Sequence, residues 1–303
     1  MNIIAVNLNP CIDWMYTVKS YTRGGLNRVQ HIRSDIAGKG INVAIALKNL
    51  GLEPVCTGFN FIENGEALTS RLNELSIGHD FVECEGAIRT NIKLYEESTG
   101  VMTELNQSGA FVSEELQSCL LGKIKTLNVC DDDILILSGS CPQGVAADFY
   151  ARICDVWCGR VFLDTEGEAL RVALARSKIF AVKPNLFELE STFGGQSVKT
   201  VQEKIMSRGV KIACVSMGSD GAFLVSSKNE YRMPALSVTA RGVAGAGDAM
   251  VAGLVYAVVH GMDEHDYLPA AMAAAAASVI LEGTEMCTLS GFREMLEKIG
   301  KSR

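Results

Sequence analysis

The stretch Val243-Ala244-Gly245-Ala246-Gly247-Asp248-Ala249-Met250-Val251-Ala252-Gly253 places a carboxylate directly after a Gly-Ala-Gly turn, where a long apolar helix begins. Small residues let a ligand approach the backbone closely, and the free N–H groups at a helix start form an anion site. An Asp in this position is also a common helix N-cap, worth about 1 kcal/mol. The same geometry would set a base beside a pocket for a phosphoryl group, so the rest of the chain must distinguish the two interpretations.

The composition predicts one large globular domain spanning residues 1–303. Hydrophobic residues make up 48% of the chain and charged residues 21%, which favours a substantial core over disorder. The Ala-rich run at 268–281 predicts a buried helix rather than a membrane span. The first residues predict a strand and carry no signal typical of a secretory leader, so we expect a cytoplasmic protein without a membrane partner.

The charge distribution favours a small anionic ligand. The net charge is −7, from 28 basic and 35 acidic side chains, which disfavours nucleic acid as a partner. Residues 19–39 nevertheless contain five basic side chains and one acid, beside a Gly-rich turn. Such a cluster can be a solvated face, but its position favours anion binding. The ten cysteines lack Cys-x-x-Cys spacing and sit mostly among apolar neighbours, which predicts packing roles rather than disulfides or a structural metal.

Short β-branched runs alternate with helical patterns along most of the chain. Strands are expected at 3–8, 55–59, 134–137, 161–163, 179–182, 211–215 and 222–225, and helices at 41–50, 65–75, 113–127, 146–157, 188–192 and 201–208. This alternation predicts an α/β fold whose mostly parallel sheet is covered on both faces. Ligands of such folds bind at the carboxyl ends of the strands.

Two regions, approximately 14–33 and 87–105, depart from this rhythm and read as β-hairpins. They are expected to pair into one small sheet that lies over the main domain as a lid. The strand edges of an exposed lid are sites that a second copy can cover, so we expect a homodimer through the lid.

Two motifs near the N-terminus combine polar side chains with turns. Ile36-Ala37-Gly38-Lys39-Gly40-Ile41-Asn42-Val43-Ala44 opens a helix with a Gly-Lys-Gly turn, and no Walker A loop occurs anywhere in the chain. Lys39 lies there beside backbone donors, and Asn42 can both donate to and accept from a polyol. Asn7-Leu8-Asn9-Pro10-Cys11-Ile12-Asp13 ends the first strand, where Asp13 either caps a turn or accepts two sugar hydroxyls.

Three further motifs lie in the second half of the chain. Lys183-Pro184-Asn185-Leu186-Phe187-Glu188 is an ordinary helix start, but Asn185 and Glu188 could also hold a hydrated Mg²⁺. Ser216-Met217-Gly218-Ser219-Asp220-Gly221 predicts a hairpin turn, and Ser138-Gly139-Ser140-Cys141-Pro142-Gln143-Gly144 a strand end followed by breakers.

In their joint order these motifs resemble those of the PfkB group of carbohydrate kinases, which have the ribokinase-like fold. The matches are Asn9-Pro10-x-x-Asp13, Gly38-Lys39-Gly40-x-Asn42-Val43-Ala44, Ser138-Gly139-Ser140, Lys183-Pro184-Asn185-x-x-Glu188 and Gly245-Ala246-Gly247-Asp248. Within the group, the leading Leu-Asn-Pro-x-x-Asp, the Gly-Lys-Gly and Arg89-Thr90-Asn91 are most similar to the 1-phosphofructokinase and tagatose-6-phosphate kinase branches. The resemblance implies a three-layer α/β/α sandwich with a mostly parallel central sheet and a small β-sheet lid.

The resemblance also implies a role for each matching residue. The general base would be Asp248, and the N–H groups that stabilise the transferred phosphoryl would belong to Gly245, Ala246 and Gly247. The sugar hydroxyls would be held by Asp13, Gly38, Asn42 and Ser140. The phosphate of the substrate would be bound by Arg28, Lys39 and Arg89. ATP would contact Lys183, Asn185, Ser216, Gly218 and Gly221, while Mg²⁺ would be organised by Asn185 and Glu188.

Three positions depart from the pattern of the group. Ala37 replaces the first of two glycines before Lys39, Ala249 replaces the Ser that commonly follows the base, and Val243-Ala244 stands in place of Thr-Val. The first change adds a methyl group, the other two remove polar groups at the site, and none of them touches the base or the anion-binding turn.

The implied reaction is in-line transfer of the γ-phosphoryl of ATP to a primary hydroxyl of a ketose phosphate. Lys39 together with Arg89-Thr90-Asn91-Ile92-Lys93 favours fructose 1-phosphate; tagatose 6-phosphate and fructose 6-phosphate stay as alternatives. A non-catalytic sugar-phosphate sensor is another, because polar groups are missing around Asp248. The basic lid disfavours a nucleoside or free-sugar kinase. A nicotinamide dehydrogenase is disfavoured because no Gly-x-Gly-x-x-Gly follows the first strand.

Overall fold

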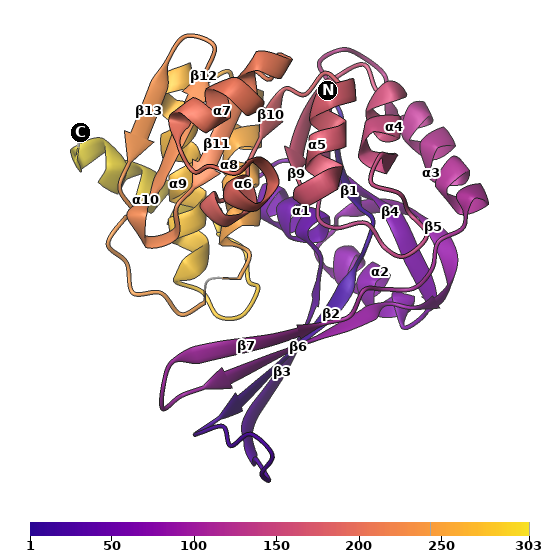
Figure 1. The fold of residues 1–303 in the computed structure, drawn as a ribbon, viewed down its shortest axis with the longest axis vertical. Helices are drawn as coiled ribbons and strands as arrows, with labels where there is room; N and C mark the ends of the chain where they lie inside the picture. Colours follow the sequence, from indigo (N-terminus) through magenta and orange to yellow (C-terminus); the bar gives the residue numbers. More distant parts are fainter. Residues whose placement is uncertain (243, 303) are drawn as a thin grey trace.

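Nine strands form the central sheet of a computed structural model that describes residues 1–242 and 244–302 (Figure 1). The strand order is β13-β12-β11-β10-β9-β8-β1-β4-β5. The strands are β1 (Ile3–Asn7), β4 (Pro54–Glu63), β5 (Gly78–Ala87), β8 (Ile134–Ser138), β9 (Arg160–Asp164), β10 (Ala181–Val182), β11 (Ile212–Ser216), β12 (Ala222–Ser226) and β13 (Glu230–Met233). Neighbouring strands from β5 to β11 run parallel, and β12 and β13 add an antiparallel edge.

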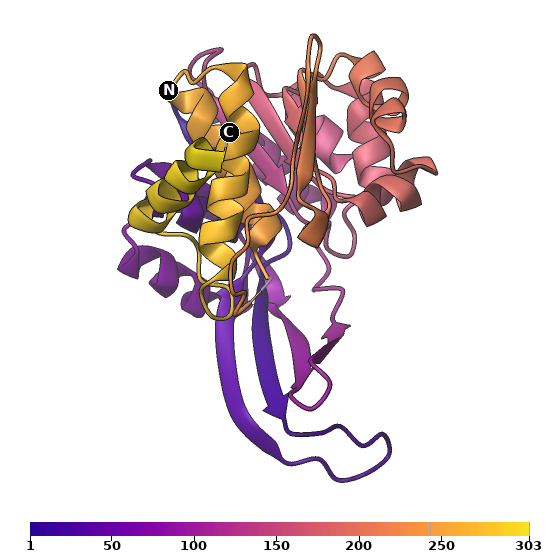
Figure 2. The same ribbon diagram turned by 90° about the vertical axis from the view of Figure 1, so that its left-hand side faces the viewer.

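Helices cover both faces of this sheet, as Figure 2 shows. One layer holds α1 (Lys39–Asn49), α2 (Gly65–Glu74), α8 (Ala246–Val259), α9 (Tyr267–Val279) and α10 (Leu289–Ser302). The other holds α3 (Glu114–Leu127), α4 (Phe149–Asp155), α5 (Gly167–Arg176), α6 (Leu186–Phe193) and α7 (Val198–Lys204). The short turns η1 (Met206–Arg208), η2 (Gly218–Asp220) and η3 (Glu264–Asp266) complete the helical elements. The predicted α/β fold with both sheet faces covered is confirmed.

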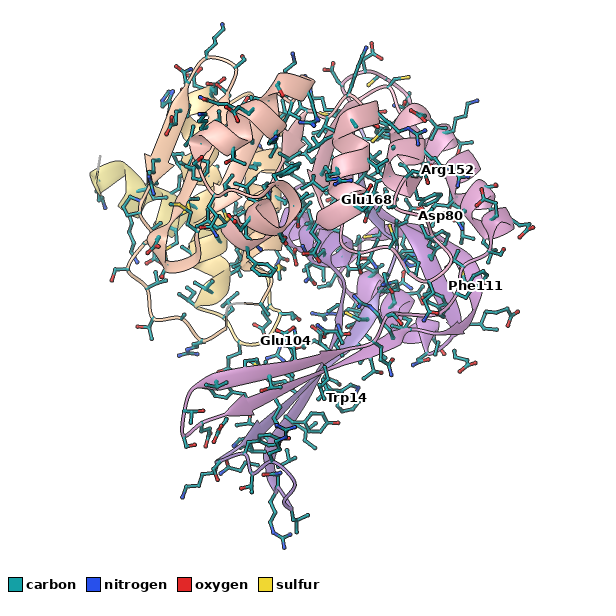
Figure 3. The ribbon with its side chains drawn as sticks, viewed as in Figure 1. Trp14, Asp80, Glu104, Phe111, Arg152 and Glu168 are labelled. Atoms are coloured by element: carbon teal, nitrogen blue, oxygen red, sulfur yellow. The ribbon has the colours of Figure 1, made fainter. Side chains whose placement is uncertain are left out.

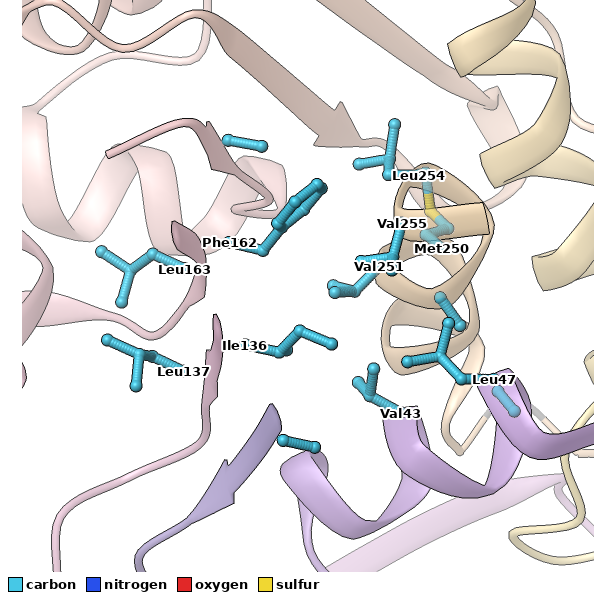
Figure 4. Close-up of a cluster of buried hydrophobic side chains, with 14 of the residues drawn as sticks. Val43, Leu47, Ile136, Leu137, Phe162, Leu163, Met250, Val251, Leu254 and Val255 are labelled. Carbon is cyan, nitrogen blue, oxygen red and sulfur yellow. The ribbon is translucent and has the colours of Figure 1, made fainter. Parts of the chain in front are cut away.

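Alternating side chains of the central strands fill two separate cores. Ile136 of β8 and Phe162 of β9 point toward α1 and α8, whereas the next residues in each strand, Leu137 and Leu163, point to the opposite layer (Figure 4). All four are nearly inaccessible to solvent. Because both faces are buried, these strands are continuous apolar runs, which is why they could be read from the sequence.

The elements that the sequence did not predict are mostly peripheral. β5 alternates charged and apolar residues at one edge of the sheet, and β13 at the other edge is only four residues long. The helices α5 and α10 were also not predicted. Each of these elements exposes a polar side to water, so its apolar pattern is weaker than that of the central strands.

A second, four-stranded sheet extends from the body in the order β3-β2-β6-β7 (Figure 1). Its strands are β2 (Cys11–Val18), β3 (Val29–Ala37), β6 (Arg89–Glu96) and β7 (Val101–Asn106). Two antiparallel hairpins join through the parallel pair β2 and β6. The two segments predicted as a lid therefore do pair with each other. Within residues 1–242 and 244–302, no helix is both long and apolar enough to span a bilayer.

Candidate active site

A cavity of about 560 Å³ lies where the lid meets the carboxyl ends of the central strands. Its lining comes from the lid, from the starts of α1, α6 and α8, from the ends of β9, β10 and β11, and from the loop before α10. The residues are Cys11, Asp13, Ala37, Gly38, Lys39, Asn42, Arg89, Asn91, Lys93, Glu104, Asp164, Lys183, Asn185, Glu188, Ser216, Ala244, Gly245, Gly247, Asp248 and Thr284. Residues far apart in sequence, most of them expected at a site, thus share one cavity.

Asp248 occupies the third position of α8 and is only 5% exposed. The residue that caps this helix is Gly245, so the N-cap interpretation of Asp248 is wrong. Its Oδ2 accepts a hydrogen bond from Asn42 Nδ2 at 2.7 Å. Burial, with a smaller contribution from the charge of Asp164, raises the pKa of Asp248 to about 6. The side chain is therefore ionised at neutral pH, yet more basic than an exposed Asp.

The turn before Asp248 is shaped to receive an anion. Gly245 adopts a left-handed conformation with φ +79°, and α8 begins at the next residue. The N–H groups of a first helical turn have no intrahelical acceptor, and the helix dipole is positive there. A Cβ on Gly247 would lie 3.1 Å from Lys183 Nζ, so an ammonium group lies next to this turn. The arrangement can stabilise negative charge beside Asp248. Val243 lies outside the described residues.

Asp164, at the end of β9, was not predicted and sits at the centre of the site's charges. It is 1% exposed, and Lys183 Nζ and Lys39 Nζ lie 3.3 and 3.7 Å from its Oδ1. Burial alone would raise its pKa, but these two ammonium groups lower it below the ordinary value. An Asp that ends an apolar strand was the signal available in the sequence.

Lys39 points into this charge cluster rather than toward the lid. Its ammonium lies 3.5 Å from Glu188 Oε1 as well as near Asp164. The side chain that the sequence assigned to the substrate phosphate is therefore already neutralised by two carboxylates.

Asn185 and Glu188 form a capping box at the start of α6. Asn185 Oδ1 accepts from the Glu188 N–H at 2.8 Å, and Glu188 Oε2 accepts from the Asn185 N–H at 2.9 Å. The helix-start interpretation of this motif thus holds, while the remaining oxygen of Glu188 faces Lys39.

The carboxylate oxygens of Asp164 and Glu188 fit a hydrated Mg²⁺. Both buried oxygens of Asp164 lack an aligned hydrogen-bond donor among the described residues, although Lys183 is within ion-pair distance. Across residues 1–242 and 244–302, no three His, Cys, Asp or Glu side chains converge to form a complete metal cage. Mg²⁺ is commonly held by one or two carboxylates together with water and substrate phosphates. Asp164 and Glu188 could supply the carboxylates.

The lid contributes a polar cluster to the other end of the cavity. Asp13 is 7% exposed; its Oδ2 accepts from Lys93 Nζ at 2.6 Å and its Oδ1 from Asn91 Nδ2 at 2.9 Å. Arg89 donates from Nη1 to the Gln107 carbonyl, and its buried Nε has no partner among the described residues. The sequence pointed to Asp13 and Arg89, but not to the contacts of Asn91 and Lys93 with Asp13.

A second groove, of about 600 Å³, adjoins the cavity and shares Asn185, Ser216 and Gly247 with it. Ser216, Gly218 and Gly221, which were predicted to face the nucleotide, line this groove. Its apolar wall was missed and includes Leu236, Val238, Met250, Met272, Ala275, Ala276 and Val279. The α9 residues of this wall occur at helical spacing, a pattern that a sequence does not distinguish from core packing.

Two predicted residues are not brought to the site. Arg28 is exposed and precedes β3 at the outer end of the lid, roughly 25 Å from the inner end by the rise of an extended strand. Ser140 is exposed and accepts from Asn9 Nδ2 at 3.2 Å. Neither residue lines the cavity or the groove. The assignments of Arg28 and Ser140 to the substrate are therefore not supported within one chain.

Comparison with known proteins identifies the family. Residues 6–290 match the pfkB family carbohydrate kinases. This chain belongs to the PfkB family of carbohydrate kinases. It is 32% identical to the 1-phosphofructokinase of Borreliella burgdorferi, over 98% of this chain and 97% of that protein. With the 1-phosphofructokinase of Bacillus subtilis it shares 35% identity over 84% of each chain.

Solved structures superpose on nearly the whole chain. Escherichia coli phosphofructokinase-2 in complex with substrates and products superposes with a TM-score of 0.92, at 26% identity, covering 99% of this chain and 100% of that one. Ribokinase of Thermotoga maritima superposes with a TM-score of 0.80 at 17% identity, over 98% of this chain and 99% of that one. The predicted ribokinase-like fold is thereby confirmed.

Two departures from the PfkB pattern can be placed in the structure. Ala37 does not have a positive φ, so its methyl group meets no backbone strain where the pattern has Gly. Ala249 is completely buried and follows Asp248 in α8. This carbohydrate kinase therefore buries a methyl group where a Ser would place a hydroxyl, and Ala249 lines neither the cavity nor the groove.

Proposed function

We propose that this chain transfers the γ-phosphoryl of ATP to a primary hydroxyl of fructose 1-phosphate, producing fructose 1,6-bisphosphate and ADP. The observation that carries the proposal is a single cavity with a buried carboxylate, Asp248, beside a helix start at one end and a polar lid cluster that contains Arg89 and Lys93 at the other. The two 1-phosphofructokinase relatives, which match most of the chain, support the choice of substrate.

Asp248 is the base of the proposed reaction. Its carboxylate takes the proton of the attacking hydroxyl, so it ends the step as a neutral acid. A bond forms between that oxygen and the γ-phosphorus while the bond from the γ-phosphorus to the ADP oxygen breaks. Asn42 holds the carboxylate in place through its 2.7 Å hydrogen bond.

The start of α8 receives the charge of the transferred group. The N–H groups around Gly245, Ala246 and Gly247 lie at the positive end of the helix, and the Lys183 ammonium lies beside them. Bound Mg²⁺, held by Asp164, Glu188 and Asn185 with water, would neutralise phosphate charge.

The lid supplies the groups for the sugar phosphate. Arg89 has a buried Nε without a partner among the described residues, and its fork suits phosphate oxygens. Asp13 and Lys93 present a charge pair that a polyol can bridge or replace. Closure of the lid over the sugar phosphate would exclude water from the cavity and so limit hydrolysis of ATP.

MgATP turnover, followed as ADP release, tests this proposal. Fructose 1-phosphate, tagatose 6-phosphate and fructose 6-phosphate are compared with free fructose and adenosine, and Asp248→Asn is the control. Fructose 6-phosphate is the second candidate, because a phosphofructokinase-2 from Escherichia coli in complex with fructose-6-phosphate superposes with a TM-score of 0.89 at 25% identity over 99% of each chain. Binding of a sugar phosphate without turnover of any compound would favour the sensor function instead.

We further propose that two copies pair through the outer face of the lid. In Figure 3, Glu104 lies on the side of the sheet facing the body, and Trp14 lies on the opposite side. The register places Ile92 beside Trp14, and Leu105 beside Ile92, on that outer face. Leu105 is 62% exposed, and Ile32, which shares this face, is 59% exposed. An exposed apolar face of this kind is typical of a protein interface.

A further inference from the structure

The loop between α9 and α10, residues 280–288, contacts the lid at Arg33 and Asp35 of β3. Arg33 in β3 donates from Nε to both oxygens of Asp35, at 3.0 and 2.9 Å, and its Nη2 lies 3.3 Å from Glu285 Oε1. A Cβ on Gly283 would lie 2.7 Å from Arg33 Cζ and 2.8 Å from Asp35 Oδ2. The Arg33–Asp35 pair therefore sits directly on the backbone of Gly283.

The same loop touches the anion-binding turn on its other side. A Cβ on Gly242 would lie 3.2 Å from the Gly283 carbonyl oxygen. The Met286 methyl group fills the space where Gly245 would carry a Cβ. Thr284, between these contacts, lines the cavity together with Gly247 and Asp248. The loop is thus packed between the lid strand and the turn that opens α8 (Figure 2).

We propose that Arg33 is a positioning residue that couples the seating of the lid to the geometry of the Gly245–Gly247 turn. This inference rests on the proposed function, because it assigns the coupling to the phosphoryl-transfer step. Closely packed contacts leave little room for independent movement, so a shift of β3 is transmitted through Gly283 and Met286 to the turn. The substrate touches neither Arg33 nor Gly283 in this scheme. Disrupting the contact should therefore lower kcat while the sugar phosphate still binds to the lid.

Gly283→Ala tests the coupling against a matched control, Gly261→Ala. Gly283 and Gly261 have φ values of +62° and +60°, so an alanine meets similar backbone strain at both positions. Only Gly283 faces Arg33; a Cβ on Gly261 would have nothing within 4 Å. We expect Gly283→Ala to lower kcat about tenfold or more, because small displacements of a catalytic group are costly. Its dissociation constant for fructose 1-phosphate, from calorimetry, should stay within about twofold of that of Gly261→Ala.

Arg33→Ala supplies the second arm of the test. It removes the side chain that Gly283→Ala would displace, so the two effects on kcat should not add in the double variant. The proposal is overturned if Gly283→Ala and Gly261→Ala have equal kcat, if kcat and substrate affinity of Gly283→Ala fall together with its Tm, or if the two effects on kcat add.

A readout that needs no turnover separates this inference from the proposed function. Backbone amide exchange of residues 244–248 is measured with and without fructose 1-phosphate. Coupling predicts that the sugar phosphate slows exchange in the unaltered protein and in Gly261→Ala, but not in Gly283→Ala. If the protein phosphorylates none of the tested sugars but shows this pattern, the proposed function fails and the coupling stands. Equal protection in all three proteins overturns the coupling, whatever the activity.

Discussion

Asp248 combines two properties that normally oppose each other in a folded protein. The side chain is nearly inaccessible to solvent, which disfavours its charge, yet Asn42, Lys39 and Lys183 stabilise the carboxylate. Burial and these stabilising contacts together give Asp248 a pKa of about 6. A base with a pKa near the working pH both exists in the required form and accepts a proton readily.

Replacing this base should remove turnover without removing binding. We expect Asp248→Asn to lower kcat by about 10²–10⁴-fold, the usual contribution of a general base. Asn can still accept the hydrogen bond of Asn42, so the dissociation constants of MgATP and fructose 1-phosphate should change little. Single-turnover kinetics and calorimetry measure the two effects. A variant that retains turnover within a few-fold of the unaltered protein would show that Asp248 is not the base.

The same substitution should stabilise the protein at alkaline pH. The folded-state pKa of Asp248 lies above its usual value of 3.8, so the native state binds a proton more tightly than the unfolded chain does. Below pH 4 both states are protonated and the group costs nothing, whereas above pH 6 the native state must bury a charge. Asp248→Asn is therefore expected to increase the free energy of unfolding at pH 8 by about 1–3 kcal/mol. Urea denaturation at pH 8 and pH 4.5 checks this, since the gain should shrink at the lower pH.

Asp164 should set the pH at which Asp248 works. Its negative charge raises the pKa of Asp248, second only to burial. Asp164→Asn removes that charge and leaves Lys39 and Lys183 to favour the Asp248 carboxylate, so the acidic limb of log(kcat/KM) should move to lower pH. Substrate phosphates titrate in the same range, so the comparison is with Asp132→Asn, a surface carboxylate that is 73% exposed. An acidic limb at the same pH in both variants would contradict this electrostatic account.

At the scale of elements, α8 depends on how closely it approaches α9. Gly253 lies against the α9 backbone, where a Cβ would come within 2.5 Å of the Ala270 carbonyl oxygen. At its start, α8 also contacts α1 through the hydrogen bond from Asn42 to Asp248. The small residues of α8 and α9 are therefore a packing requirement.

Gly253→Ala should push the two helices apart. We expect a loss of about 1–3 kcal/mol in the free energy of unfolding, which is typical of overpacking. Gly122→Ala in α3 is the matched control, since a Cβ there would have nothing within 4 Å, and it should stabilise by about 0.5–1 kcal/mol through helix propensity. Thermal unfolding of both variants separates packing from propensity. Stabilisation by both substitutions would show that α8 and α9 have room to spare.

In the lid, the sequence pattern predicted which strands form but not where each side chain lies relative to the cavity. Segments 14–33 and 87–105 were expected to form hairpins that pair, and the structure contains that sheet. Arg28, which was expected to bind the substrate phosphate, does not line the cavity of its own chain, because the direction of β3 puts it at the outer end of the lid. Arg28 is close to the Gly-Lys-Gly turn in the sequence but not in space, because the nine extended residues of β3 lie between them.

At the scale of the whole molecule, the lid has a polar face toward the cavity and an apolar face away from it. A dimer through the apolar face should dissociate when charge is placed on it. We expect Ile32→Asp combined with Leu105→Asp to give a monomeric mass by light scattering, because burying two carboxylates at the interface is costly. Val129→Asp is the control, since Val129 is 77% exposed and lies after α3, away from the lid. A monomeric mass for the unaltered protein at working concentration would refute the dimer.

The sequence by itself determined the central α/β body and most of the residues around the base. Buried parallel strands are continuous apolar runs, and the turns after them need Gly, Pro, Asn or Asp, so both features are local and readable. Only the tertiary structure decided that Asp164 joins Lys39 and Lys183, that Asn42 contacts Asp248, and that Arg28 lies far from the cavity. These outcomes depend on which strand ends converge and on the direction in which the lid extends. Ion pairs and pKa shifts follow from distances of a few ångströms between separate segments of the chain, which local patterns do not contain.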